Sequence, residues 1–173
     1  MKYHEKTILS ETMYEGKIIT VKKDLVSLSA NNQHVPRELV VHSGGVCVAA
    51  RLNNGNYLLV SQYRYGVQET SLEFVAGKLE INEDPQMAIK RELEEETGYV
   101  ANKWEYLGVI HPSPAYLSEK IHLYLAEDLT KTQTKLDENE FLEVVEFSLD
   151  QLKKMVKSNT IKDAKTIVLI SRL

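Results

Sequence analysis

Residues 77–99 read GKLEINEDPQMAIKRELEEETGY and hold six glutamates among 23 residues. The densest part of this stretch is Glu92 to Glu96. Side chains three and four residues apart lie on one face of an α-helix, so Glu92, Glu95 and Glu96 are expected to converge. Glu94 points away from that face. Like charges at these spacings repel by roughly a few tenths of a kcal/mol per pair, and bound cations reverse that repulsion. The cluster therefore indicates a place for hard cations, which prefer oxygen ligands.

Helix signals flank the glutamates on both sides. Asp84 suits the N-cap, Pro85 suits the first helical position, and Gly98 suits the position just past the last turn. Ile89 and Leu93 share one side of the expected helix with the glutamates, so a buried stripe borders the carboxylates. Most charge runs form a solvated surface, and that alternative stays open here. The apolar stripe favours a helix over residues 84–98 whose glutamates face a cleft.

Shorter patterns around this helix predict a mixed sheet. Apolar runs bounded by turn residues predict strands over 17–21, 25–28, 39–42, 46–51, 57–63, 71–75, 104–111, 120–126 and 141–147. Turns are expected at residues 31–32 and 53–56, a polar loop at 129–139, and further helices at 149–157 and 163–173. Strands and helices mix without a regular alternation, which favours a mixed α/β architecture with a helix packed on the sheet.

Composition limits the classes of function. The chain has 173 residues, 43% of them hydrophobic, which suits one domain with at most a small appendage. A net charge of −4 gives no basic surplus, so no nucleic-acid partner is expected. No apolar stretch approaches the roughly 20 residues that span a bilayer, so we expect no membrane partner and a cytoplasmic protein. The single cysteine, Cys47, lies in an apolar run and is expected to be buried.

The glutamate-rich segment resembles the signature of the Nudix hydrolases. That signature is a glycine, five residues, a glutamate, seven residues, and then Arg-Glu-apolar-x-Glu-Glu-x-Gly-apolar. The matching residues are Gly77, Glu83, Arg91, Glu92, Leu93, Glu95, Glu96 and Gly98, with Tyr99 in the last apolar slot as a mild departure. The resemblance implies the α/β (α+β) class, with a Nudix α/β/α sandwich around a mixed sheet.

The resemblance also implies a metal site in this segment. In the family these glutamates bind Mg²⁺, or alternatively Mn²⁺, and the reaction is hydrolysis of a nucleoside diphosphate linked to another group. The implied ligands are the carboxylates of Glu92, Glu95 and Glu96 and the backbone carbonyl of Ala76. Glu95 and Arg91 carry the implied catalytic roles within the segment. We expect Arg91 to orient a neighbouring glutamate rather than to touch phosphate.

Further motifs lie outside this segment: Arg37-Glu38, Gln62-Tyr63-Arg64, the run from Leu72 to Gly77, the run from Ser113 to Glu119 and the stretch Asp163-Ala164-Lys165-Thr166. With these motifs the chain resembles the ADP-ribose pyrophosphatase subfamily. That similarity implies a small antiparallel β module over residues 1–40, used for dimerisation and substrate binding, and a Nudix hydrolase domain over 41–173. The implied substrate-binding residues are Arg37, Arg64, Glu73, Pro114 and Glu119. The subfamily prefers glycine where this sequence has Ala115, which leaves the conformation of that loop open.

A second acidic run, Asp-Glu-Asn-Glu at residues 137–140, aligns with the loop that supplies the general base in the subfamily. Glu138 is the expected base and Glu140 the alternative, while an ordinary charged loop remains a further interpretation. The resemblance implies a homodimer that converts ADP-ribose to AMP and ribose 5-phosphate. Two alternatives stay open: a Nudix hydrolase of another compound, such as a sugar nucleotide, a dinucleoside polyphosphate or an oxidised nucleotide, and a non-catalytic Nudix-like ligand sensor.

Overall fold

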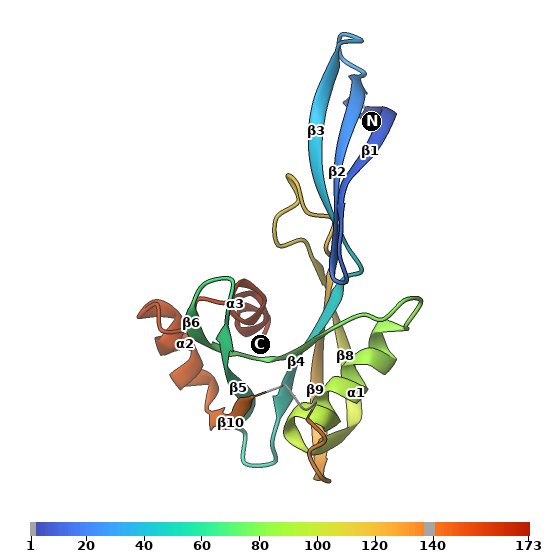
Figure 1. Ribbon diagram of the computed structural model, residues 1–173. Helices are drawn as coiled ribbons and strands as arrows, with labels where there is room; N and C mark the ends of the chain where they lie inside the picture. Colours follow the sequence, from blue (N-terminus) through green and yellow to red (C-terminus); the bar gives the residue numbers. More distant parts are fainter. Residues whose placement is uncertain (1–2, 137–140) are drawn as a thin grey trace. The chain divides into compact units, whose positions relative to one another are not determined.

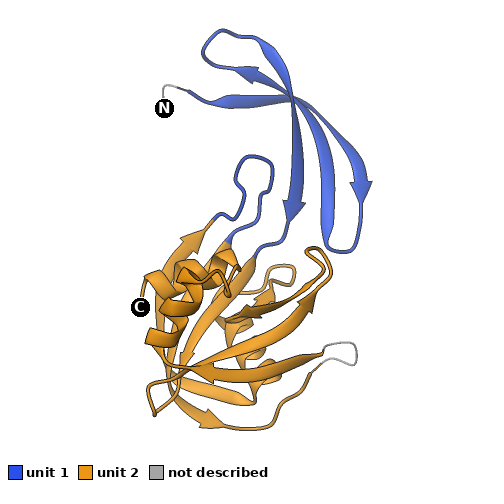
Figure 2. Ribbon diagram, turned by 90° about the vertical axis from the view of Figure 1, so that its left-hand side faces the viewer, with its two compact units in different colours: residues 1–44, 111–120 blue, residues 45–110, 121–173 orange. Residues whose placement is uncertain are grey.

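The computed structural model describes residues 3–136 and 141–173. The chain divides into two compact units, residues 1–44 with 111–120 and residues 45–110 with 121–173 (Figure 2). The strands are β1 (Glu5–Glu15), β2 (Ile19–Leu28), β3 (His34–His42), β4 (Gly45–Arg51), β5 (Tyr57–Arg64), β6 (Glu69–Glu73), β7 (Val75–Lys78), β8 (Tyr99–Ile110), β9 (Ile121–Lys131) and β10 (Leu142–Phe147), and the helices are α1 (Pro85–Thr97), α2 (Leu149–Lys157) and α3 (Ala164–Ser171) (Figure 1).

The first unit is an antiparallel sheet in the order β1-β2-β3. β2 is continuous where the sequence predicted two short strands, because its backbone pairs with β1 and β3 along its whole length. Pro36 lies in β3, an outer strand of this sheet, which is where a sheet tolerates the missing N–H of proline. The segment 111–120 joins the same unit: Val40 N–H donates to Tyr116 O at 2.7 Å, and Ser118 N–H donates to Val40 O at 2.9 Å.

The second unit is built on a seven-stranded mixed sheet. Its main path is β10-β5-β4-β9-β8, with β6 added to β5 and β7 added to β4. The β4–β9 pair is parallel and the other pairs are antiparallel. The sequence predicted β4, β5, α1 and α2 closely. The polar loop that the sequence predicted over 129–139 is partly wrong. β9 continues to Lys131, because Lys131 pairs with Tyr99 at the start of β8.

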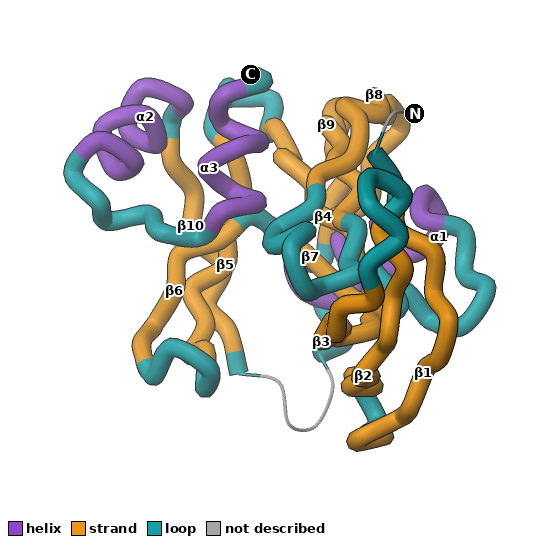
Figure 3. Tube along the Cα trace, turned by 90° about the horizontal axis from the view of Figure 1, so that it is seen from above, coloured by secondary structure: helices purple, strands orange, loops and turns teal. Residues whose placement is uncertain are grey.

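Helices cover both faces of this sheet (Figure 3). β4 is buried on both sides and alternates between two apolar clusters, Val46, Val48 and Ala50 facing one and Cys47 and Ala49 facing the other. α1 packs on the first cluster through Ala88, Ile89 and Leu93. α2 and α3 pack on the second through Leu152, Leu169 and Ile170. The arrangement is the α/β/α sandwich expected from the sequence, and Cys47 is fully buried as predicted. No helix among the described residues is long and apolar enough to cross a membrane.

Candidate functional site

The glutamate-rich helix α1 begins and ends where the sequence predicts. Asp84 is the N-cap, and its Oδ1 accepts from the backbone N–H groups of Gln86 at 2.9 Å and Met87 at 3.1 Å. Gly98 ends the helix in the left-handed region, with φ 68°, and its N–H donates to Glu94 O at 2.8 Å. These two caps set where α1 begins and ends. Ala88, Ile89 and Leu93 are buried in the core, and this packing sets the direction of the glutamates in the last two turns.

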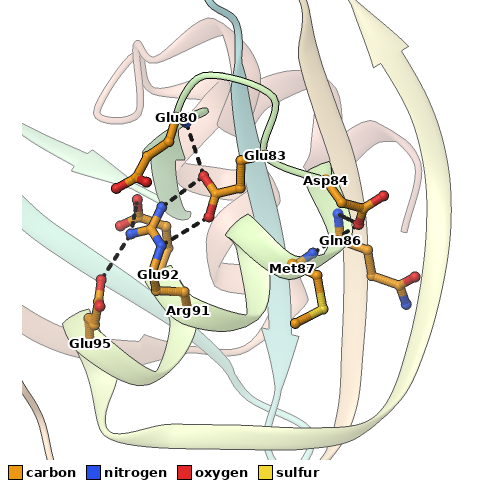
Figure 4. A network of polar contacts seen from close by, with 8 residues as sticks. All are labelled: Glu80, Glu83, Asp84, Gln86, Met87, Arg91, Glu92 and Glu95. Atoms are coloured by element: carbon orange, nitrogen blue, oxygen red, sulfur yellow. Dashed lines mark hydrogen bonds and ion pairs between the residues drawn. The ribbon is translucent and has the colours of Figure 1, made fainter.

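Arg91 gathers three carboxylates around one guanidinium (Figure 4). Its Nε and Nη2 donate to Glu83 at 3.1 and 3.2 Å. Its Nη1 donates to Glu92 Oε1 at 2.9 Å and Glu95 Oε2 at 3.0 Å. Glu83 also accepts from the backbone N–H of Glu80 at 3.0 Å, so the loop before α1 is tied to the helix. The hydrogen bonds with Glu83, followed by the charge of Glu92, raise the pKa of Arg91, and those same bonds lower the pKa of Glu83.

Glu92 lies directly against the backbone of β7. A Cβ added to Gly77 would stand 2.0 Å from both Cδ and Oε1 of Glu92, so only glycine leaves room for this carboxylate. Ala76, whose carbonyl the family resemblance implies as a metal ligand, is the preceding residue of β7 and pairs with Cys47 on β4. Glu96, one turn after Glu92 on α1, is only 3% exposed. β7 and α1 together thus carry three of the expected ligands, Ala76, Glu92 and Glu96.

This donor set fits a divalent cation. Carboxylates and backbone carbonyls are the ligands that Mg²⁺ and related hard cations take. Within residues 3–136 and 141–173, no three Asp, Glu, His or Cys side chains already form a group that could hold a metal ion. Arg91 explains this for Glu92 and Glu95, because it draws one oxygen of each toward itself. Each carboxylate offers roughly four lone-pair sites, so pairing with Arg91 leaves oxygen positions for a cation.

A second ionic cluster connects β5, β6 and α3. Glu73, at the end of β6, accepts two hydrogen bonds from Arg64 at 2.8 Å each. It also accepts one from Lys165 Nζ at 2.5 Å, and Lys165 donates to Asp163 Oδ1 at 2.8 Å. Burial alone would raise the pKa of Glu73, but the hydrogen bonds from Arg64 and the charge of Lys165 outweigh it and lower the pKa to about 2. The carboxylate of Glu73 is thus charged and fully engaged with protein groups.

The remaining predicted substrate residues lie in the first unit. The guanidinium of Arg37 donates to Glu5 on β1, with Nη2 to Oε1 at 2.6 Å and Nε to Oε2 at 2.9 Å. Oε1 of Glu119 lies 3.5 Å from His42 Nδ1. Pro114 belongs to the 111–120 segment, whose Leu117 forms a bridge with Val40 of β3. The candidate bases Glu138 and Glu140 fall outside the described residues.

Sequence reasoning gave no role to Asp163 or Lys165, although the stretch 163–166 stood out as similar to the subfamily. Their partner Glu73 lies 92 residues away from Lys165 in the chain, and nothing local points to that pairing. Sequence reasoning gave Glu83 only a place in the Nudix signature. Glu83 precedes the N-cap Asp84, so helical spacing gives no signal for its contact with Arg91.

Comparisons with known proteins agree with this geometry. The family profile described as the NUDIX domain matches residues 41–168. The chain is 41% identical to the ADP-ribose pyrophosphatase of Bacillus subtilis (strain 168) over 171 residues, covering 98% of this chain and 92% of that protein. It is 39% identical to the methanol dehydrogenase activator of Bacillus methanolicus over 173 residues, covering 99% and 93%. A crystal structure of an ADP compounds hydrolase superposes with a TM-score of 0.85 and 22% identity, covering 97% of this chain and 91% of the other.

Proposed function

This chain belongs to the Nudix family, whose members depend on divalent metal ions, and from that premise we propose that it hydrolyses ADP-ribose to AMP and ribose 5-phosphate. The observation that carries the proposal is the carboxylate of Glu92 seated on Gly77, with Glu95 and Glu96 on the same helix. The choice of substrate is supported by the near full-length relationship to an ADP-ribose pyrophosphatase.

In this proposal Mg²⁺ is the physiological cation and Mn²⁺ the alternative. Glu92, Glu95, Glu96 and the carbonyl of Ala76 would hold it. A bound cation would polarise the phosphoryl oxygens, lower the pKa of an attacking water and offset the negative charge of the pyrophosphate. Arg91 holds one oxygen of Glu92 and one of Glu95 in fixed directions, because its Nη1 donates to both. It acts as a positioning residue.

The other assignments follow the sequence expectations. Arg37 and Arg64 would contact the adenine or the phosphates, because guanidinium groups pair well with dianionic diphosphates. Glu119 would contact the terminal ribose or the metal shell, and Pro114 would shape the loop that carries it. Glu138, with Glu140 as the alternative, would accept the proton of the attacking water. Together these groups supply positioning and charge stabilisation, which is what phosphoryl transfer chiefly requires of a protein.

We also propose a homodimer in the cytoplasm, with no nucleic-acid or membrane partner. β1 supports the dimer because all of its residues are exposed, including the apolar side chains of Ile8, Leu9, Met13 and Tyr14. Exposed apolar side chains grouped on one strand favour burial against another protein surface. Residues 1–40 would serve as the dimerisation and substrate module, and residues 41–173 as the hydrolase domain.

A substrate panel tests the proposed activity. The purified protein is incubated with Mg²⁺ and ADP-ribose, GDP-mannose, a diadenosine polyphosphate or an oxidised nucleotide, and the products are separated by anion exchange. We expect AMP and ribose 5-phosphate from ADP-ribose at the highest kcat/KM, and loss of product when a chelator removes the cation. Brisk turnover of another compound with negligible cleavage of ADP-ribose would contradict the proposal.

The relative named methanol dehydrogenase activator supports a second candidate, stimulation of a partner dehydrogenase. A coupled assay separates the two functions: methanol dehydrogenase is measured with wild-type protein and with Glu96→Gln. Stimulation by wild type alone would tie that effect to the hydrolase site. Equal stimulation by both would assign it to a non-catalytic contact.

A further inference from the structure

The buried carboxylate of Glu73 links α3 to Arg64. The Glu73 side chain is 3% exposed and receives three hydrogen bonds, two from Arg64 and one from Lys165. A buried carboxylate held by several charged donors has little freedom to rotate. If one of the donors is removed, the carboxylate keeps its charge but loses part of what fixes its direction.

Lys165 itself is fixed from two sides. Its side chain is 14% exposed, and its ammonium bonds both Glu73 and Asp163. Asp163 is the N-cap of α3, where its Oδ2 accepts from Thr166 N–H at 2.9 Å. Oγ1 of Thr166 in turn accepts from Phe74 N–H at 2.9 Å, in the break between β6 and β7. The start of α3 is therefore joined to the end of β6 through both backbone and side chain.

Arg64 is the exposed end of this chain of contacts. Its side chain is 42% exposed, and Nε and Nη2 are the atoms that bond Glu73. Among the described residues, Nη1 makes no hydrogen bond or ion pair with a protein group, which leaves this nitrogen available to a ligand. The hydrogen bonds with Glu73 are the main cause of the raised pKa of Arg64, and the charge of Glu96 also contributes. Arg64 is thus within electrostatic reach of the metal-binding face of α1.

The geometry points to Lys165 as a positioning residue for substrate: through Glu73, it holds the guanidinium of Arg64 in a fixed orientation, with Nη1 available to bind a phosphate oxygen of the nucleoside diphosphate. This inference deepens the proposed function and rests on it. A preoriented guanidinium binds an anion with less loss of side-chain entropy than a mobile one. Lys165 touches no substrate in this scheme, so its effect must pass entirely through Arg64.

The test combines a binding readout with a direct view of Arg64. Lys165→Met keeps the apolar length of the side chain and removes its charge. We expect KM for ADP-ribose to rise about tenfold, with kcat within about threefold of wild type. In a double-mutant cycle, Lys165→Met should add little to the KM of Arg64→Ala, since both changes remove the same contact. Independent, additive losses would overturn the inference.

A matched control is available three residues earlier. Lys162 makes an exposed ion pair with Glu69 at 2.8 Å, and Lys162→Met should leave both KM and kcat unchanged. Circular dichroism and thermal unfolding verify that both variants fold. Lys165→Arg restores a charged donor and should recover part of the KM, which a purely structural role would not predict.

Nuclear magnetic resonance of arginine Nε–Hε groups gives a readout without activity. The Arg64 signal is assigned by its loss in Arg64→Lys, and we expect it to broaden in Lys165→Met but not in Lys162→Met. An unchanged Arg64 signal in Lys165→Met, or a broadened signal with an unchanged KM, overturns the inference. If wild type fails to cleave ADP-ribose, the proposed function is wrong. The double-mutant cycle of Lys165 and Arg64 is then measured with the compound of the substrate panel that the protein does hydrolyse.

Discussion

Gly77 and Glu92 approach each other so closely that the glycine hydrogen is all that fits between them. Gly77→Ala would push the Glu92 carboxylate off β7, because the side chain can move more easily than the strand. We expect kcat to fall by about 10- to 100-fold, the usual cost of misplacing a metal ligand through its support, with the fold retained. Steady-state kinetics and circular dichroism measure the two effects.

Gly66→Ala is the matched control for this change. Gly66 lies in the turn between β5 and β6, its φ is not positive, and a Cβ there meets nothing within 4 Å. We expect wild-type activity from Gly66→Ala. Equal activity in both variants would show that the position of Glu92 does not matter for turnover.

Glu96 allows a test of the metal assignment by a single atom exchange. Glu96→Gln keeps the shape of the side chain but removes the negative charge that a cation needs, and we expect turnover to fall by at least about 100- to 1000-fold. Glu94→Gln, two residues earlier on α1, should remain active because the side chain of Glu94 belongs to no part of the proposed site. Titration with Mn²⁺ followed by electron paramagnetic resonance should show weaker binding in Glu96→Gln only.

The lowered pKa of Glu73 predicts how the free energy of unfolding depends on pH. Its pKa in the folded protein is about 2, against an ordinary value of 4.5, so its contribution is present above about pH 4.5 and is lost as pH falls toward 2. That shift corresponds to roughly 3 kcal/mol in the free energy of unfolding. Urea unfolding at pH 7, 5, 4 and 3 measures it.

Glu73→Gln should be less stable at pH 7, because Arg64 and Lys165 lose their buried partner. The difference in the free energy of unfolding between wild type and Glu73→Gln should narrow as the pH falls, because protonation removes the charge of Glu73 from wild type. Parallel stability curves from pH 7 to 3 would rule out Glu73 as the responsible group.

Among the elements, α1 owes its start to one carboxylate. Asp84→Ala removes the acceptor for two backbone N–H groups and should lower the free energy of unfolding by about 1 kcal/mol. The site glutamates lie in the last two turns, so kcat should stay within about twofold. Asp84→Asn keeps an accepting oxygen and should restore most of the stability, as measured by urea unfolding. A loss of stability in Asp84→Asn as large as in Asp84→Ala would contradict the capping role.

The sequence predicted elements well where local signals decide them. Asp84 and Gly98 mark α1 through capping preferences that act within one turn. The break between β6 and β7 was not predicted, because Phe74 N–H leaves the ladder to bond Thr166, 92 residues away. The extension of β9 to Lys131 likewise depends on pairing with distant β8. Hydrogen bonds between residues so far apart in the chain leave no periodic pattern in the sequence of either partner.

The same contrast holds for the candidate site. The i,i+4 spacing of Arg91 and Glu95 on one helix made their contact predictable. The engagement of Glu73 by Lys165 was not, since it needs the fold to bring α3 beside β6. Sequence reasoning therefore assigned Glu73 directly to substrate, whereas its buried position favours action through Arg64.

For the whole molecule, the proposed dimer can be tested on β1. Leu9 is 63% exposed in that strand, and Leu9→Asp would place a charge among exposed apolar side chains. Light scattering coupled to size exclusion should give twice 19.7 kDa for wild type and a shift toward 19.7 kDa for Leu9→Asp. Tyr65, 82% exposed in the other unit, provides Tyr65→Asp as a control that should remain dimeric. A wild-type mass of 19.7 kDa would refute the dimer.

The division of the first unit into residues 1–44 and 111–120 affects how the nascent chain matures. Translation delivers about 5–20 residues per second, so β3 leaves the ribosome several seconds before the segment that bonds Val40 on both its N–H and its C=O. All of residues 45–110 are made in between. During that interval the N–H and C=O of Val40 at the edge of β3 lack these partners, and unpaired groups on a strand edge are a site for pairing with other chains. A ribosome that stalls before residue 120 would therefore hold an incomplete, aggregation-prone unit.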